Sequence, residues 1–301
     1  MLSVIVCSRN KILFNEFAEN ISRTIGVEYE IIDIDNSENK YSIFSAYNLG
    51  VSKSKFPYLC LVHEDVLFHS DNWGKNVIAH LQDPKTGILG VAGGDMITRV
   101  PASWPTSVSL SVNIIQTDYS ARKRPTKFLL EPEKYDQPKR SSITLDGIFL
   151  CMRKELMQKI HFDETLKGFH GYDYDISIQS AIAGYTNYVI FDVKLEHFSR
   201  GKTNILYFRN LIHIFKKWEM YLPLKGDTIT EEELADIKHI ELRMLKQLSK
   251  KMIRKGFESD EIISETTYYA NKIESTEAIR NIKLRIFLTR LFNSPKYLFR
   301  K

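Results

Sequence analysis

The sequence has 301 residues and a formal net charge of +5, with 43% hydrophobic and 26% charged residues. This composition is typical of a globular protein and excludes wholesale disorder and collagen-like repeats. Its apolar runs, such as residues 148–152, are too short to span a bilayer, and its first residues do not resemble a signal peptide. Cys7, Cys60 and Cys151 lie in separate apolar runs, so we expect reduced core thiols in a cytoplasmic protein.

Strand and helix patterns alternate over the first hundred residues. Apolar β-rich runs predict strands, and apolar residues at helical spacing predict helices. In chain order, strands are predicted at 2–7, 30–34, 58–62 and 88–92, and the helices between them at 13–21, 43–50 and 73–81. This alternation predicts an α/β fold, in which a mostly parallel sheet carries helices on both faces.

The regular pattern is interrupted at residues 93–144. This stretch contains five prolines and the basic cluster Arg122-Lys123-Arg124. We expect long loops and short antiparallel strands here, which shape a binding cleft and close over bound ligands. Regularity then returns, with strands predicted at 147–152 and 188–193 and helices at 154–160 and 174–183.

A helical region follows the last predicted strand. From about residue 203 the apolar residues keep helical spacing, and residues 230–233 form a capping-box pattern. We therefore predict two parts, a sheet domain at 1–202 and a helical C-terminal extension at 203–301.

Polar side chains follow the predicted strands, at the edge where ligands bind in an open parallel sheet. They are Ser8, Arg9, Asp35, Asn36, Glu64, Asp65 and His197. The sequence has neither a Gly-rich dinucleotide fingerprint after the first strand nor a Walker loop. Adjacent acids after a strand suit a hard divalent cation that bridges phosphates. Each pattern also has a structural interpretation: a solvated loop for the acid pair, an Asx turn for Asp35-Asn36 and a structural imidazole for His197.

A loop rich in glycine and aromatic residues precedes the helix predicted at 174–183. Asp173 and Asp175 lie at the start of this helix, where carboxylates commonly cap the helix. A carboxylate in such a loop is also a candidate general base for a hydroxyl nucleophile. Capping by Asp175 and catalysis by Asp173 are compatible.

Taken in chain order, these motifs resemble the family 2 glycosyltransferases, which are inverting, metal-dependent enzymes with the Rossmann-like GT-A fold. The resemblance covers residues 2–201, and the order of the motifs is more specific than any single motif. The matching segments are 2–10, 30–37, 46–50, 58–65, 146–153, 162–175 and 196–198. His63-Glu64-Asp65 stands where the family carries Asp-x-Asp, so the first acid of that motif is replaced here.

The resemblance implies a role for each candidate residue. Asp173 is the catalytic base, and Asp65 and His197 bind Mn²⁺ or Mg²⁺. A nucleoside diphosphate sugar (UDP- or GDP-linked) is contacted by Ser8, Arg9, Asp35, Asn36, Asn48 and Glu64. The acceptor is a hydroxyl of a glycan or a lipid-linked sugar. Because the Gln-x-x-Arg-Trp signature of processive members is missing, we expect transfer of a single sugar in each encounter.

Two other classes of function remain open. A sugar-1-phosphate nucleotidyltransferase also combines a Rossmann-like sheet with acidic metal ligands, but it normally carries a Gly-rich basic loop after the first strand. Ser8-Arg9-Asn10-Lys11 is not Gly-rich. A non-catalytic protein that binds sugar nucleotides is the second alternative, because the altered metal motif is compatible with binding alone.

The basic charge is concentrated at the C-terminal end. Residues 271–301 contain eight Lys and Arg and two acids, so this segment carries +6 and the other 270 residues carry −1. The sheet domain therefore gives no electrostatic support for nucleic-acid binding. Apolar residues among the cations of 276–301 indicate either a helix lying on the anionic inner face of a membrane or packing on the core or a second subunit.

Overall fold

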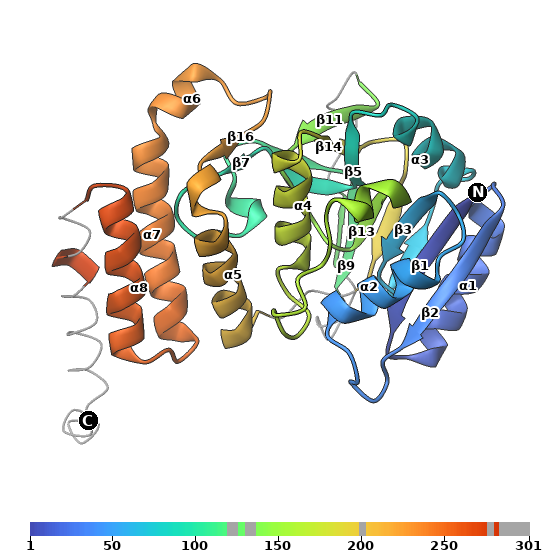
Figure 1. The fold of residues 1–301 in the computed structure, drawn as a ribbon, viewed down its shortest axis with the longest axis horizontal. Helices are drawn as coiled ribbons and strands as arrows, with labels where there is room; N and C mark the ends of the chain where they lie inside the picture. The colour runs from blue at the N-terminus through green and yellow to red at the C-terminus, as the bar shows by residue number, and fades with distance from the viewer. Residues whose placement is uncertain (119–125, 130–136, 199–202, 276–279, 283–301) are drawn as a thin grey trace.

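The computed structural model describes residues 1–118, 126–129, 137–198, 203–275 and 280–282. These residues form a central sheet of seven strands in the order β11-β14-β5-β13-β3-β1-β2 (Figure 1). The strands are β1 (Leu2–Ser8), β2 (Tyr29–Asp35), β3 (Tyr58–Val62), β5 (Thr86–Gly90), β11 (Lys139–Ser142), β13 (Phe149–Arg153) and β14 (Thr186–Ile190). Only β13 and β11 run opposite to the rest, which confirms the predicted α/β fold with a mostly parallel sheet.

Helices cover both faces of this sheet because its strands are apolar on both sides. Along β1, Val4 and Val6 pack on one face with α1 and α3, whereas Ile5 between them packs on the other face with α2 and α4. The four helices are α1 (Lys11–Thr24), α2 (Ile43–Lys53), α3 (Trp73–Leu81) and α4 (Tyr172–Ile182). Cys60 and Cys151 are buried in the core, Cys7 is half-buried, and all three are free thiols, as predicted.

Three short sheets extend the central one. The largest has the order β10-β9-β15-β4. Its strands are β4 (Val66–Phe68), β9 (Ile114–Asp118), β10 (Thr126–Leu129) and β15 (Leu195–His197). A second sheet contains β6 (Ala92–Gly94), β8 (Leu110–Val112) and β12 (Thr144–Leu145). A third sheet contains β7 (Met96–Ile97) and β16 (Leu224–Lys225). The stretch at 93–144 thus holds short strands, as predicted, while the basic cluster at 122–124 lies outside the described residues.

Some predicted elements have different bounds or a different type in the structure. The strand predicted at 88–92 is divided between β5 and β6. The helix predicted at 154–160 is a 3₁₀ helix, Lys154–Gln158, and further 3₁₀ turns lie at Trp104–Thr106 and Glu219–Tyr221. The strand that carries His197 was not predicted, because three residues are too few to show an alternating pattern.

The C-terminal helices pack on the sheet domain. They are α5 (Ile205–Lys217), α6 (Glu231–Ala235), α7 (Ile237–Arg254) and α8 (Ser259–Lys272). α5 stands beside α4, and α7 and α8 follow in turn on the side away from the sheet (Figure 1). The predicted capping box at the start of α6 is formed by Thr230 and Glu233. A single apolar core runs from Leu59 in the sheet to Tyr269 in α8. The predicted division at residue 202 is therefore crossed by one continuous core.

A buried ion pair reinforces this packing. Arg99, in the loop after β7, donates through its backbone N–H and its guanidinium to the carboxylate of Glu241 on α7. Glu241 is fully buried, so its charge depends on this bidentate partner. The irregular segment after β7 is thereby fixed to the helical region.

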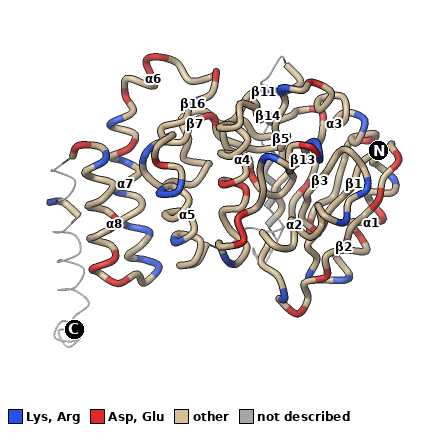
Figure 2. Tube along the Cα trace, in the orientation of Figure 1, with Lys and Arg blue, Asp and Glu red and all other residues tan. Residues whose placement is uncertain are grey.

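Residues of both charge signs are interspersed along the described chain (Figure 2). Of the predicted basic tail at 276–301, the structure describes only residues 280–282, and the rest lies outside the described residues. Ile282 is buried in the apolar core that includes α7 and α8, which favours packing for this part of the tail. Among the described residues, no helix combines the length and apolar character needed to cross a membrane.

Candidate active site

Two imidazoles and a carboxylate come together at the carboxyl edge of the central sheet. His63 and Asp65 directly follow β3, and the chain continues into β4 at Val66. β4 pairs antiparallel with β15 in a register that places His197 opposite Val66. This short pairing brings His197, far away in sequence, beside Asp65.

The geometry of this group fits a bound cation. One ligand atom from each of His63, Asp65 and His197 lies within 4.8 Å of the others. Asp65 Oδ1 is 3.8 Å from His63 Nδ1 and 3.5 Å from His197 Nε2. Metal–ligand bonds of about 2.1 Å place neighbouring ligand atoms roughly 3.0–3.4 Å apart, so a small contraction would complete the site. The donor set therefore suits the divalent cation that the sequence predicted.

A hydrogen-bond chain connects this cluster to the start of α4. His63 Nε2 lies 2.8 Å from the Tyr172 hydroxyl, which donates to the Gly147 carbonyl at 2.8 Å. A Cβ at residue 147 would lie 2.2 Å from that hydroxyl oxygen, so only glycine allows Tyr172 to reach this position. Burial lowers the pKa of His63, which favours the neutral imidazole.

Asp173 lies next to Tyr172, in the first turn of α4, and is half-buried. Burial and, secondly, the nearby carboxylate of Asp146 raise the pKa of Asp173 to about 7. The backbone N–H groups of Gly147, Asp173 and Tyr174 act in the opposite direction because they stabilise the carboxylate. The result is a carboxylate that changes charge near neutral pH, as a general base requires.

Asp146 is held at the edge of the same site. Trp104 Nε1 donates to Asp146 Oδ2 at 2.9 Å, and the Ile148 N–H donates to the other oxygen at 3.1 Å. The charge of Asp146 also acts on His63 and on Tyr207 of α5. Burial and the charge of Asp173 raise the pKa of Tyr207. Trp104 and Tyr207 thus form an aromatic rim around the carboxylates.

The predicted donor-binding loop after β1 lies beside the cation cluster. The Glu64 carboxylate accepts from the backbone N–H groups of Arg9 and Asn10 at 3.0 Å, which fixes the loop against the β3 exit. Burial raises the pKa of Glu64, and these two N–H groups partly offset the shift. The Ser8 hydroxyl donates to Asp33 at 2.5 Å, and the Arg9 guanidinium lies 5.5 Å from the centre of the Phe169 ring.

The other predicted donor contacts make bonds within the protein. Asp35 is exposed and accepts from the Ser37 N–H at 2.9 Å, which forms the Asx turn that was its alternative interpretation. Asn36 is fully buried, and its amide exchanges two hydrogen bonds with the backbone of Tyr41. The Asn48 amide joins α2 to the backbone of Phe162 in the same reciprocal way.

Asp175, two residues after the candidate base, has a structural environment. Its side chain is 1% exposed and accepts from Trp218 Nε1 at 2.7 Å and from Gln179 Nε2 at 2.8 Å. Lys217 Nζ lies 3.0 Å away and also binds Asp163. Asp175 therefore joins α4 to the end of α5 through side-chain contacts, in addition to its predicted place in the first turn of α4.

Three residues of the site, His63, Tyr172 and Asp146, lie in segments that the family resemblance covers but were given no individual role. Trp104 lies in the segment at 93–144 that was expected to close over bound ligands. His63 begins the tripeptide that replaces Asp-x-Asp, and an imidazole there is itself a signal for a metal ligand. Asp146 lies between β12 and β13, and β13 runs antiparallel to its neighbours. Since the start of an antiparallel strand lies at the carboxyl edge of the parallel ones, the direction of β13 explains why Asp146 lies at this edge.

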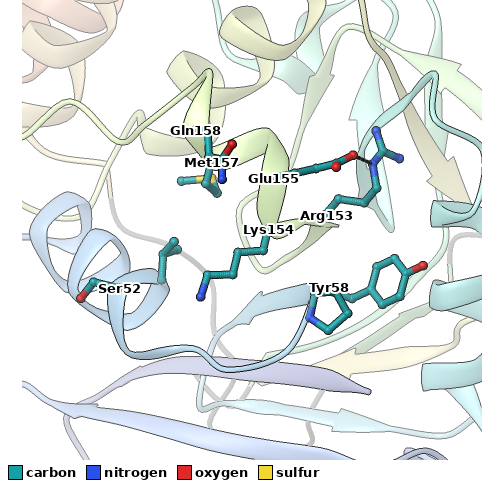
Figure 3. Close-up of a pocket in the computed structure, with 9 residues that line it drawn as sticks. Ser52, Tyr58, Arg153, Lys154, Glu155, Met157 and Gln158 are labelled. Carbon is teal, nitrogen blue, oxygen red and sulfur yellow. Dashed lines mark hydrogen bonds and ion pairs between the residues drawn. The ribbon is translucent and has the colours of Figure 1, made fainter.

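A hollow lies at the opposite edge of the sheet (Figure 3). Its volume is about 530 Å³, and it is lined by the end of α2, the start of β3 and the end of β13. Arg153 donates to the carbonyl oxygens of Leu81, Asp83 and Pro84, and Lys154 Nζ donates to Ser54. These cations are satisfied within the protein, so this hollow is not the chemical site.

Comparisons with known proteins agree with this description. A family profile described as a glycosyltransferase-like family matches residues 3–199, which is more than half of the chain. No curated protein has a significantly similar sequence. A mannosyltransferase from Pyrobaculum calidifontis, solved with GDP-mannose and Mn²⁺, superposes with a TM-score of 0.50 at 13% identity, over 97% of this chain and 87% of that one.

A second solved structure is that of GalNAc-T7 with UDP, GalNAc and Mn²⁺. It superposes with a TM-score of 0.51 at 11% identity and covers 99% of this chain. The present chain spans 57% of the length of that protein. At these identities the likeness concerns the fold, which is that of the GT-A enzymes.

Proposed function

The chain belongs to the glycosyltransferase-like family, and we propose that it is an inverting glycosyltransferase. The donor is a nucleoside diphosphate sugar, either UDP- or GDP-linked, because the two GT-A proteins similar in fold were solved with UDP and with GDP-mannose. One sugar is moved in each encounter to a hydroxyl of a glycan or a lipid-linked acceptor.

One observation carries this proposal: a candidate base and a candidate cation site are joined through two residues. The Tyr172 hydroxyl contacts His63 and donates to the Gly147 carbonyl oxygen, and Asp173 is the next residue along α4. The nearby backbone of Gly147 also stabilises the Asp173 carboxylate. Transfer from a nucleoside diphosphate sugar needs a base on the acceptor side and positive charge at the leaving diphosphate. The site has both groups at one edge of the sheet.

Asp65 and His197, with His63 beside them, are the residues that would hold the cation. A bound Mn²⁺ neutralises charge on a departing diphosphate. The loop of Ser8 and Arg9 lies at the same edge and is fixed by Glu64, so it is placed to contact the nucleotide. Trp104 and Tyr207 provide ring surfaces near Asp173 for the sugar or the acceptor.

Asp173 acts on the acceptor. Its carboxylate takes the proton of the acceptor hydroxyl while that oxygen forms a bond to the anomeric carbon. The bond from the anomeric carbon to the diphosphate oxygen breaks, and its electron pair leaves with the nucleoside diphosphate. Because attack and departure occur on opposite faces of the carbon, the configuration is inverted.

The proposal is tested with labelled UDP- and GDP-sugars in Mn²⁺, with and without an array of acceptor glycans. We expect release of the nucleoside diphosphate from at least one donor, faster with a suitable acceptor and with an inverted linkage by NMR. Consumption of a nucleoside triphosphate and a sugar phosphate would instead identify a nucleotidyltransferase. Donor binding without turnover on any acceptor would support a non-catalytic binding protein.

A further inference from the structure

The hydrogen bonds of His63 fix which ring nitrogen carries its proton. The Tyr172 hydroxyl donates its one proton to the Gly147 carbonyl, which can only accept. The contact of 2.8 Å between His63 Nε2 and the same hydroxyl therefore requires the imidazole to donate. In the neutral ring the lone pair is then on Nδ1, the atom 3.8 Å from Asp65 Oδ1.

The same reasoning applies to His197. Gln116 Nε2 donates to the His197 carbonyl at 3.0 Å, which identifies the other amide atom of Gln116 as the oxygen. That oxygen lies 3.1 Å from His197 Nδ1, so Nδ1 carries the proton. In the neutral ring the lone pair is on Nε2, the atom 3.5 Å from Asp65 Oδ1.

Two lone pairs and one carboxylate oxygen thus point at one another. Ligand atoms of His63, Asp65 and His197 that lie within 4.8 Å of one another are arranged as the ligands of one cation between them would be. We infer that His63 is a metal ligand through Nδ1, that the cation has two imidazole ligands and one carboxylate ligand, and that Tyr172 is the positioning residue that sets the His63 tautomer. This inference rests on the proposed function of the site.

The donor set has a consequence for the choice of metal. Imidazole nitrogen favours transition metals over Mg²⁺, and the affinity of a nitrogen-containing site rises from Mn²⁺ to Co²⁺. Mg²⁺ prefers an all-oxygen octahedron with several waters. The replacement of an acid by His63 therefore makes the site selective for Mn²⁺ or a later transition metal against Mg²⁺, whereas the sequence had left both open.

Pulsed EPR of bound Mn²⁺ on the full chain tests the ligand assignment, because each coordinated imidazole adds a nitrogen modulation to the signal. We expect two coordinated imidazoles in the wild type and one in His63→Asp. His239→Ala is the matched control, since His239 is a surface histidine paired with Asp236, and it should retain two. A single imidazole in the wild type would overturn the inference. It would not bear on the proposed transferase activity, which is tested separately with labelled sugar nucleotides.

Metal titrations without substrate test the selectivity. The wild type should bind Mn²⁺ at least tenfold more tightly than Mg²⁺, and His63→Asp should reduce this ratio about tenfold. Tyr172→Phe keeps the ring and removes only the hydroxyl, so Mn²⁺ affinity should fall about tenfold while the melting temperature of the metal-free protein stays close to that of the wild type. An unchanged ratio in His63→Asp, or unchanged affinity in Tyr172→Phe, would contradict the assignment.

Discussion

The two edges of the central sheet differ in how their polar side chains are satisfied. At the edge with the hollow shown in Figure 3, Arg153 and Lys154 donate to backbone carbonyl oxygens, so their charges are compensated within the fold. At the carboxyl edge, acids and imidazoles lie against one another around His63, Asp65 and Asp173. Such an arrangement gains stability from a ligand or a cation. The grouping of acids and imidazoles thus points to the carboxyl edge as the candidate site.

The largest expected effect is at the candidate base. Asp173→Asn should lower kcat about 10³-fold, because the amide cannot accept the acceptor proton. Binding of the nucleotide donor, measured by calorimetry in Mn²⁺, should change less than threefold. Near-normal turnover in this variant would show that another group takes the proton.

The raised pKa of Asp173 predicts a dependence of stability on pH in the metal-free protein. A carboxyl group with a pKa of about 7 in the folded state and an ordinary pKa when unfolded stabilises the fold fully at low pH and loses this contribution as pH rises through 7. Asp173→Asn should therefore match the wild type near pH 4 and exceed it at pH 8, by up to about 4 kcal/mol. Urea denaturation at several pH values measures the difference, and a constant difference across this range would contradict the shift.

A substitution of Asp175, on the same helix as Asp173, should reduce stability and leave activity nearly unchanged. Asp175→Asn removes a buried charge that faces Lys217 and Trp218, and we expect a loss of about 3 kcal/mol of unfolding free energy. Below its melting temperature the variant should keep kcat within about threefold of the wild type, unlike Asp173→Asn. Loss of kcat in fully folded protein would give Asp175 a role in the chemistry.

At the opposite edge, Arg153→Met should weaken the fold and spare the chemistry. The substitution leaves the carbonyl oxygens at the end of α3 without their charged donor, which should cost about 2 kcal/mol. Thermal denaturation measures the loss, and kcat/KM of the folded fraction should be unchanged. A specific fall in kcat/KM would show that this edge contributes to function.

The smallest effect is expected from filling the hollow itself. Ser52 lines it and is largely exposed, so Ser52→Trp should occupy part of the space at little cost to the fold. Donor affinity and kcat should stay within about twofold of the wild type. A strong loss of donor binding would place a ligand in this hollow and remove the contrast between the two edges.

The sequence predicted the central part of the fold well. The alternation of apolar runs and helical stripes, the capping box of α6 and the free cysteines all depend on local pattern, and the structure confirms them. Strand β15 was missed, because an element of three residues carries no period to detect. The helix predicted after β13 exists, but it is a shorter 3₁₀ helix.

By itself, the sequence determined that a family-typical series of polar motifs follows the strands. It predicted Asp65 and His197 as cation ligands and Asp173 as the base. Only the tertiary structure decided what each motif residue contacts. The β4–β15 register brings His197 to Asp65, and the reversed direction of β13 brings Asp146 and Gly147 to the same edge. The packing of α5 on α4 brings Trp218 and Lys217 to Asp175. These contacts join residues distant in sequence, and no local pattern encodes which of them will meet.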